Sequence, residues 1–553
     1  MSNKRKNKKK KKQRNLLTDL QKFFADGLGF IVTGYMVAVI GIMPFYFTNG
    51  YVSIGTDKHT FLYESFRIVG MIFGSVLPLY LGFGLGRVLK EKSSLAEHLK
   101  GIIKKLSLTD WFALGYGMAV VVSYLLSKYK EPGEYGDALY GANKWYMGTL
   151  TQLMFVAVYF AVSRFWKGKK WVLALWIPVT CAVFFLAYLN RFQIYPIEMK
   201  NANPHFISTI GNINWYCGYL VIVFFGIMTY IILQTRKNRG MNGVWGIWLV
   251  LGFATLLTQG SFSGIVTLLV VLWGLYLYLM RDKKYLFSYF LTLSAMGVAG
   301  ILTYILRRCY PGAYNYEDPV VDVWMNSPLI FVVSGVILFM VVLVKVTEKK
   351  NINSEKFFVV LGYLLSAGLL GGLLLFTVLG IKNTLHPGSI GALSANPLFT
   401  FDLGWGSNRI ATWKAGWMCF VSQDLWGKLF GVGPDCMSSY IMTGENQELL
   451  QMVSVVFDGL ILTNTHCELL TVLVNTGLLG LISYGGLLLS NMIRCLKVGK
   501  TNAYSGACGF AIFAYMINNL FSFSQSLNGI TIFLVLGMGE VFLKQEEETG
   551  CSE

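Results

Sequence analysis

Residues 243–280 read GVWGIWLVLGFATLLTQGSFSGIVTLLVVLWGLYLYLM. Two apolar runs, 243–258 and 263–280, are separated only by Gln259 to Phe262. Each run comes close to the about 20 apolar residues that a helix needs to cross a bilayer. A connection this short at membrane depth has to be a tight helical hairpin, because backbone groups left unpaired in lipid cost too much free energy. The stretch therefore predicts two adjacent transmembrane helices.

Apolar runs of this kind fill the chain of 553 residues. Its mean hydropathy is +0.53, and 54% of its residues are hydrophobic while only 14% are charged, against about 25% charged in soluble domains. The sequence thus predicts an all-α integral membrane protein, a polytopic bundle of about 14 transmembrane helices. The apolar blocks run approximately over 28–48, 66–86, 109–127, 145–163, 171–189, 209–233, 243–258, 263–280, 285–306, 328–344, 357–381, 466–490, 505–521 and 526–543.

The basic residues predict an orientation. The net charge is +18, and Lys4 to Arg14 form a nearly continuous basic run. If the N-terminus is cytoplasmic and the spans alternate, 34 of the 47 Lys and Arg residues fall in inside segments, as the positive-inside rule requires. Both termini are therefore expected inside, with the basic run against anionic lipid. This distribution argues against a nucleic-acid partner.

One segment between spans is much longer than the others. It faces outward in this topology, and loops longer than about 15 residues inside a compact protein are usually functional or disordered. Its apolar stretches Ile410 to Phe420 and Leu449 to Leu462 predict amphipathic helices on the membrane surface. The expected organisation is a basic cytoplasmic tail (1–27), spans 1–11 (28–381), the large extracytoplasmic loop (382–465), spans 12–14 (466–543) and a cytoplasmic tail (544–553).

Three features of the long segment are candidates for chemistry. His466 lies where the segment re-enters the membrane, and an ionisable residue at that border is a functional candidate, as a base or a phosphate contact; alternatively it is a polar helix-entry residue. The guanidinium of Arg409 is suited to binding the oxygens of a diphosphate; alternatively, Arg409 is an arginine whose side chain extends to the membrane interface. Gly431 and Gly433 permit close backbone approach to a ligand, or simply a turn. No histidine or carboxylate spacing predicts a metal site.

Four short motifs, in this order, resemble those of the O-antigen ligase and polymerase superfamily of bacterial membrane glycosyltransferases. The resemblance covers about residues 206–490, while residues 1–205 match only in being hydrophobic. The motifs are Gly211-Asn212-Ile213-Asn214, the pair Arg409 and Trp413, Gly431-Val432-Gly433-Pro434, and His466 to Leu470 followed by Asn475-Thr476-Gly477-Leu478-Leu479-Gly480.

The chain departs from the family pattern at two positions. Cys467 stands where the family usually has Asn, and Phe262 stands in the hairpin where relatives often have Arg. Another outward arginine, Arg191, Arg307 or Arg308, is a candidate to replace that charge. The family's usual count is also nearer twelve spans.

The resemblance implies a reaction. A glycan on undecaprenyl diphosphate would be transferred to an acceptor hydroxyl of a glycan, lipid, wall polymer or protein at the outer face of the bacterial cytoplasmic membrane. It implies catalytic roles for Arg409 and His466 and no cofactor or metal, because the donor is already activated. Ligase and polymerase are not distinguished, and a polysaccharide-lipid flippase or another multi-span transporter is the alternative. The residues expected to bind substrate are Asn212, Asn214, Trp413, Gly431, Gly433 and Glu468.

Overall fold

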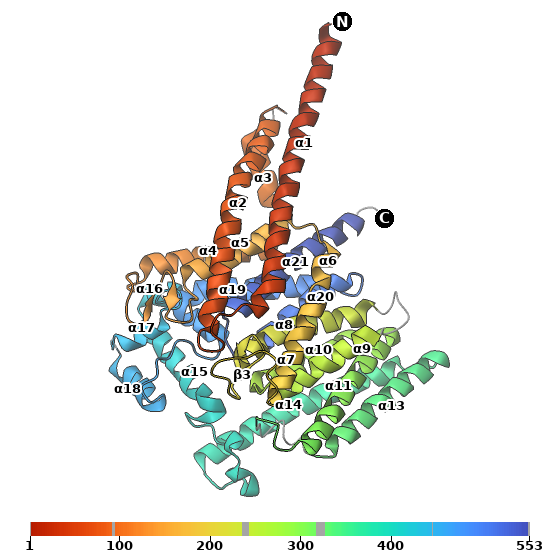
Figure 1. Cartoon of the computed structure of the whole chain (residues 1–553), viewed down its shortest axis with the longest axis vertical. Helices are drawn as coiled ribbons and strands as arrows, with labels where there is room; N and C mark the ends of the chain where they lie inside the picture. The colour runs from red at the N-terminus through yellow and green to blue at the C-terminus, as the bar shows by residue number, and fades with distance from the viewer. Residues whose placement is uncertain (1, 91–93, 235–242, 317–326, 445, 551–553) are drawn as a thin grey trace.

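The computed structural model of the chain describes residues 2–90, 94–234, 243–316, 327–444 and 446–550, and it consists almost wholly of helices (Figure 1). The inside segment 234–242 of the predicted topology lies almost entirely outside the described residues. The fold class predicted from the sequence, an all-α multi-pass membrane protein, is confirmed.

Each predicted apolar block coincides with a helix. In the described part of the chain eleven helices are long and apolar enough to cross a membrane, one of them formed by α6 and α7 together over Lys170–Arg191; α5, α9 and α20 have only 17, 16 and 16 residues. At about 1.5 Å per residue, 16 residues reach about 24 Å of a 30 Å hydrocarbon core, so three of the fourteen spans stay a prediction. The helices are α1 (Ser2–Val37), α2 (Ile54–Lys90), α4 (Leu108–Leu126), α5 (Thr149–Phe165), α7 (Trp176–Arg191), α8 (Ile213–Gln234), α9 (Gly243–Thr258), α10 (Phe262–Leu279), α11 (Lys283–Cys309), α13 (Leu329–Lys349), α14 (Glu355–Leu385), α19 (Glu468–Val498), α20 (Ala503–Asn518) and α21 (Ser526–Gly550).

The long segment also folds into helices. α15 contains the predicted amphipathic stretch at 410–420, whereas α18 ends at Val456, short of the predicted Leu462, because Asp458 and Gly459 adopt positive φ angles of 50° and 74°. The basic segment 2–27, predicted as a tail, is the first part of α1. The remaining elements are η1 (Ala38–Ile42), η2 (Met43–Phe45), α3 (Leu95–Lys104), α6 (Lys170–Ala174), η3 (Gly391–Ala395), η4 (Pro397–Phe399), α15 (Trp405–Val421), α16 (Leu425–Phe430), α17 (Met437–Met442), α18 (Gln447–Val456), and the hairpins β1 (Gly136–Asp137) with β2 (Gly141–Ala142) and β3 (Phe206–Ile207) with β4 (Gly211–Asn212).

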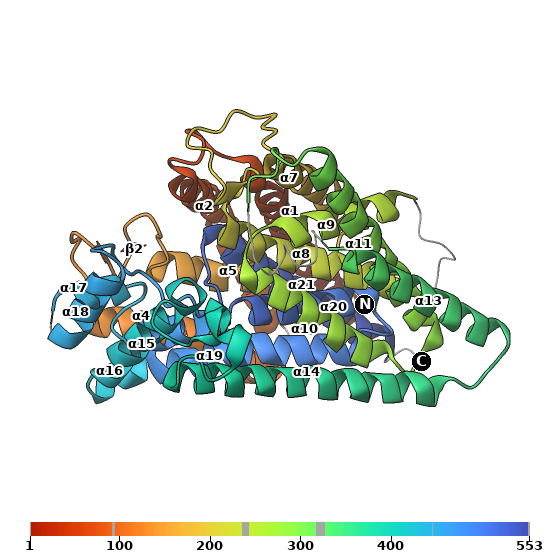
Figure 2. The ribbon, with the colours of Figure 1, turned by 90° about the horizontal axis from the view of Figure 1, so that it is seen from below.

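Burial separates central helices from peripheral ones. Nearly all of the apolar parts of α21 and α8 are buried, whereas hardly any residue in the apolar parts of α2 and α14 is buried. Figure 2 shows α14 along one edge of the bundle, where Leu364, Leu370 and Leu374 are more than half exposed. Apolar surface this continuous is unstable in water but suits lipid, so α2 and α14 are among the helices whose faces meet the bilayer.

The α9–α10 hairpin shows how backbone groups are satisfied where a turn lies among spans. The buried Arg191 guanidinium donates from Nε to the carbonyl oxygen of Thr258 (2.7 Å) and from Nη2 to that of Gln259 (2.6 Å). The Tyr316 hydroxyl donates to the carbonyl oxygen of Gly260 (2.9 Å). Three successive carbonyls that the hairpin leaves without helical partners are therefore hydrogen-bonded by side chains, as a low-dielectric surrounding requires.

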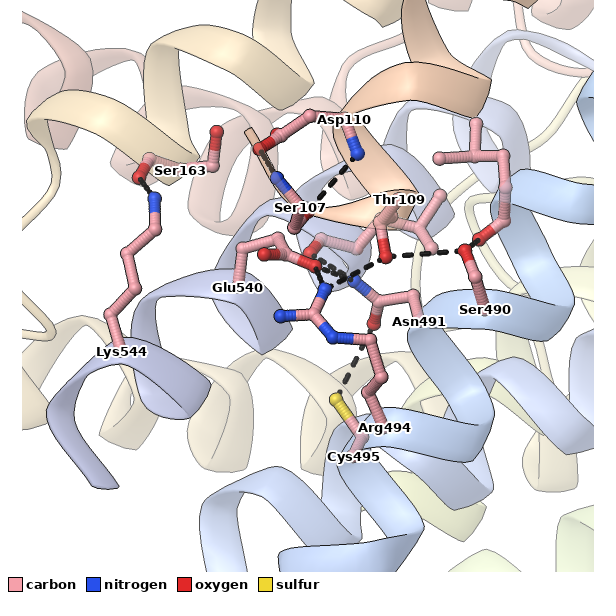
Figure 3. A network of polar contacts seen from close by, with 12 residues as sticks. Ser107, Thr109, Asp110, Ser163, Ser490, Asn491, Arg494, Cys495, Glu540 and Lys544 are labelled. Carbon is pink, nitrogen blue, oxygen red and sulfur yellow. Dashed lines mark hydrogen bonds and ion pairs between the residues drawn. The ribbon is translucent and has the colours of Figure 1, made fainter. Parts of the chain in front are cut away.

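A network of buried charges joins α4, α5, α19 and α21 near the ends at which α19 and α21 finish (Figure 3). Arg164 forms an ion pair with Asp110 (2.6 Å), and Arg494 forms one with Glu540; neither carboxylate side chain is exposed. Asn491 also donates to Glu540 (3.2 Å). An unpaired charge buried among membrane helices is costly. The two ion pairs therefore fix which helix ends lie together.

A break in α19 positions the long segment. At Gly477 the backbone leaves helical geometry (φ 69°, ψ −171°), a region open essentially to glycine alone. The N–H groups of Val432 and Gly433 donate to the carbonyl oxygens of Val474 and Asn475, both at 3.1 Å. The loop after α16 is thereby hydrogen-bonded to the carbonyls that the break releases, and a Cβ on Gly431 would lie 2.2 Å from the carbonyl carbon of Asn475.

Replacing Gly477 by alanine should therefore destabilise the fold strongly. The added Cβ would lie 2.3 Å from the carbonyl carbon of Leu429 and would also occupy a disallowed backbone region, so we expect a loss of about 3 kcal/mol or more. The measurement is thermal unfolding of the purified protein in detergent. Gly485→Ala is the matched control, since a Cβ on Gly485, in the same helix, meets nothing within 4 Å. Equal midpoints for the two variants would contradict the break.

A double-mutant cycle tests the ion pair between Arg494 and Glu540. Glu540→Leu leaves Arg494 charged without its carboxylate and should cost about 3–5 kcal/mol, whereas the double variant Arg494→Leu/Glu540→Leu should recover part of that loss. Glu540→Gln keeps an oxygen for Asn491 and should cost less than Glu540→Leu. Thermal unfolding of each variant measures its loss of stability. If the loss in the double variant equals the sum of the losses in the two single variants, the pair is not coupled.

Candidate functional site

Arg409 is held by an unusual start to α15. Gly406, Ser407 and Asn408 all have left-handed φ angles, between 61° and 66°, which is costly for the two that are not glycine. Regular helix begins at Arg409, whose Nε donates to the carbonyl oxygen of Phe521 (3.2 Å) and whose Nη1 donates to that of Gly406. Burial lowers the pKa of the guanidinium. Among the described residues its Nη2 makes no hydrogen bond, so one donor nitrogen is available to a ligand.

His466 lies in the same site. It too has a positive φ, 50°, stabilised by its N–H donating to Asn464 Oδ1 (3.1 Å). Its ring meets the ring of Phe523 edge to face, with centroids 5.0 Å apart. The pKa of His466 is lowered to about 4, mainly by burial and to a smaller extent by the positive charge of Arg409. At neutral pH the imidazole is therefore uncharged and able to accept a proton.

The short loop between α20 and α21, residues 519–525, joins these two predicted catalytic residues. Phe521 accepts the hydrogen bond from Arg409, and its ring lies 6.1 Å from that of Trp413, while Phe523 contacts His466. The Trp413 Nε1 is buried and, within the described part of the chain, donates to no acceptor. Sequence reasoning missed this loop; the signal available was its density of Asn, Ser and Gln between two apolar blocks.

Glu468 is the first residue of α19 and is buried. Its N–H donates to the carbonyl oxygen of Asn519 (2.8 Å), and its Oε2 accepts from the N–H of Ser524 (2.6 Å). The same 519–525 loop therefore receives both the backbone and the side chain of Glu468, and it links this predicted substrate-binding residue to His466 and Arg409.

A second buried carboxyl group, Asp435, follows the Gly-Val-Gly-Pro motif. Its Oδ2 accepts from the N–H groups of Ala142 (2.8 Å) and Met147 (3.0 Å) in the loop between α4 and α5. The pKa of Asp435 is raised to about 7, mainly by burial and to a smaller extent by the nearby charge of Glu468, although the two hydrogen bonds lower it. Sequence reasoning missed this residue.

Asp435 and Glu468 line one small cavity of about 50 Å³. A water molecule needs about 10–15 Å³ of such space, so the cavity has room for more than one water molecule. Asn464 and Phe523, both of which contact His466, line it as well. The two carboxyl groups therefore share a space that water can fill with two residues that contact His466.

The Gly-Asn-x-Asn motif lies against the α9–α10 hairpin. The N–H of Asn214 donates to Asn212 Oδ1 (2.9 Å), and Asn214 Oδ1 accepts from the hydroxyl of Ser261 (2.8 Å). The next hairpin residue, Phe262, contacts the ring of Phe521, with centroids 6.2 Å apart. The two asparagines are thus connected to Arg409 through the hairpin and the 519–525 loop.

The structure also places the three arginines considered as replacements for the arginine absent at Phe262. Arg191 is the one whose guanidinium binds the hairpin carbonyls, as described above. Arg307 and Arg308 stack instead on Tyr314 and Tyr304, at 4.2 Å and 5.2 Å from the ring centroids. Arg191 therefore brings positive charge to the hairpin from a different helix.

Gly431 and Gly433 have a different position from the other predicted site residues. Their φ angles are 79° and 128°. Both contact the broken part of α19, and Gly433 also lies against Ser127. Their effect on the site is to place Asp435. In the described ranges no three His, Cys, Asp or Glu side chains come together as a metal ion would require.

No family model and no curated protein matches this chain. The fold and the site define a class: an all-α multi-pass membrane protein in which the segment between α14 and α19 meets the loop between α20 and α21 around Arg409, Trp413, His466 and Glu468.

Proposed function

We propose that this protein is a membrane glycosyltransferase of the O-antigen ligase and polymerase type, in the bacterial cytoplasmic membrane with both termini cytoplasmic. It transfers a glycan from undecaprenyl diphosphate to an acceptor hydroxyl at the outer face. The observation that carries the proposal is the pairing of Arg409, which has a free donor nitrogen, with an uncharged His466 against the same loop. The transfer needs a cation for the diphosphate leaving group and a base for the acceptor hydroxyl.

Arg409 suits the diphosphate leaving group. As the bond from the anomeric carbon breaks, negative charge grows on the diphosphate oxygen, and a fixed cation nearby stabilises that charge in the transition state. Arg409 is largely buried, and charges interact more strongly where water is excluded. Its position is set by the Phe521 and Gly406 carbonyls, so little reorganisation is needed when the donor binds.

His466 suits the acceptor hydroxyl. In the free protein its pKa of about 4 keeps it neutral but makes it a weak base. A bound diphosphate adds negative charge beside it and offsets the effect of Arg409, which raises the pKa toward the working pH. The histidine then takes the acceptor proton as the acceptor oxygen attacks the anomeric carbon.

Substitution of the two residues tests the assignment. Arg409→Ala and His466→Ala should each lower transfer by about 100-fold or more, measured with purified protein, undecaprenyl-diphosphate-linked glycan and acceptor. Arg67→Ala and His386→Ala are matched controls, since both side chains are exposed and lie outside the site; they should leave transfer unchanged.

The same variants in cells separate this proposal from a flippase. A transferase defect leaves lipid-linked glycan on the outer leaflet with surface polymer lost. Glycan lipid confined to the inner leaflet would identify a transporter instead, and normal polymer in both alanine variants would remove Arg409 and His466 from the site.

The dependence on pH gives a separate test of His466. Protonation below its lowered pKa removes the base, so kcat/KM, which reports the free enzyme, should stay level as pH falls from 7 to about 5 and decline toward pH 4. The acid limb of kcat, which reports the donor-bound enzyme, should lie at higher pH. The Asp435→Asn variant should show the acid declines of kcat/KM and of kcat at the same pH as the unmodified protein. A kcat/KM midpoint near 6.5, the ordinary value for histidine, would contradict the lowered pKa.

A further inference from the structure

A large apolar groove lies between α6, α7, α8, α9, α20 and α21. Its free volume is about 520 Å³, within the about 300–1,000 Å³ of pockets that hold small molecules. The walls are almost wholly hydrocarbon, with Ile222, Ile227 and Met538 among them. Ala174 and Val244 also line it and are exposed, so the groove opens sideways between α6 and the start of α9. An opening among membrane helices admits a lipid chain.

One end of the groove is polar and positively charged. Lys170, Tyr230 and Tyr504 line this end. The Tyr230 hydroxyl donates to that of Tyr504 (3.1 Å), and Lys170 Nζ lies 5.8 Å from the centre of the Tyr504 ring. Within the described part of the chain Lys170 forms no ion pair, and it belongs to the basic run Lys167 to Lys170. An anionic group is the complement of this arrangement.

The groove is separate from the site of Arg409 and His466. α21 begins at Ser526, next to the 519–525 loop, and Phe542, which lines the groove, lies 16 residues further along it. That separation is about 24 Å along a helix, most of the way across the hydrocarbon core. Figure 1 shows α6 on the side of the molecule where the C-terminus lies. The polar end therefore faces the leaflet on the side of the chain termini.

We propose that this groove binds an anionic phospholipid from the leaflet on the side of the termini. One acyl chain fills the apolar groove, and the headgroup phosphate lies at Lys170 and the hydroxyls of Tyr230 and Tyr504. A phospholipid with these properties is abundant where basic loops meet a membrane surface. Its chain completes the packing between α7, α8 and α20, which the protein's own side chains leave open. The proposal does not depend on the function proposed above.

Lipid retention by the purified protein tests the proposal. The full chain is reconstituted with phosphatidylglycerol or with phosphatidylcholine of the same chains, extracted in mild detergent and examined by native mass spectrometry. We expect one retained phosphatidylglycerol and little phosphatidylcholine. Ala174→Trp, which narrows the opening, should reduce retention at least tenfold, and Lys170→Ala about fivefold, the effect of one lysine near anionic lipid. Lys167→Ala, a neighbour paired with Asp26, is the matched control.

Photo-crosslinking of the unmodified chain keeps the proposal testable if Ala174→Trp does not fold. Phosphatidylglycerol with a photoreactive group in its acyl chain should label residues 222–230 and 507–511. Labelling elsewhere, equal retention of phosphatidylcholine, or unchanged retention in the Lys170→Ala variant would overturn the proposal. Preferential displacement by a polyprenyl phosphate would also overturn it, and would assign the groove to an isoprenoid chain.

Discussion

The backbone contact between residues 431–433 and the broken part of α19 is the constraint on which the site depends. An intact helix would keep the carbonyls of Val474 and Asn475 for itself; the break at Gly477 releases them to the N–H groups of Val432 and Gly433. The long segment is thereby attached to α19 at Val474 and Asn475, about two turns into the helix, as well as through the chain at its first residue. The start of α19, with His466 and Glu468, and the loop carrying Asp435 are fixed relative to each other by this attachment.

Charged groups occupy both ends of the bundle for different physical reasons. At one end the Asp110–Arg164 and Arg494–Glu540 pairs neutralise each other and tie four helices together. At the other end Arg409 binds only backbone carbonyls and His466 has no acidic partner in the described structure. A buried cation without a counter-ion is costly, and this cost is offset when an anion binds. The contrast supports a structural role for the first group and a ligand-binding role for the second.

The polar groups of the candidate site come from segments far apart in the chain. The 519–525 loop contacts Arg409, His466 and Glu468, while the α4–α5 loop binds Asp435. Neither loop belongs to the motifs that resemble a known family. They hold Arg409, His466, Glu468 and Asp435 in position, and burial of His466 in this site lowers its pKa.

The sequence by itself determined the properties that depend on neighbours along the chain. Runs of apolar residues predicted the helices, the four-residue connection predicted the α9–α10 hairpin, and short motifs predicted Arg409, Trp413 and His466 as site residues. The apolar pattern did not predict where α18 ends, because the end is set by the Asp458-Gly459 turn and not by the run of apolar residues. Only the tertiary structure decided that Arg191 binds the hairpin, that Asp435 and Glu468 share a cavity, and that Gly431 and Gly433 contact α19. These outcomes depend on hydrogen bonds between residues tens to hundreds of positions apart, which periodicity and spacing along a chain do not encode.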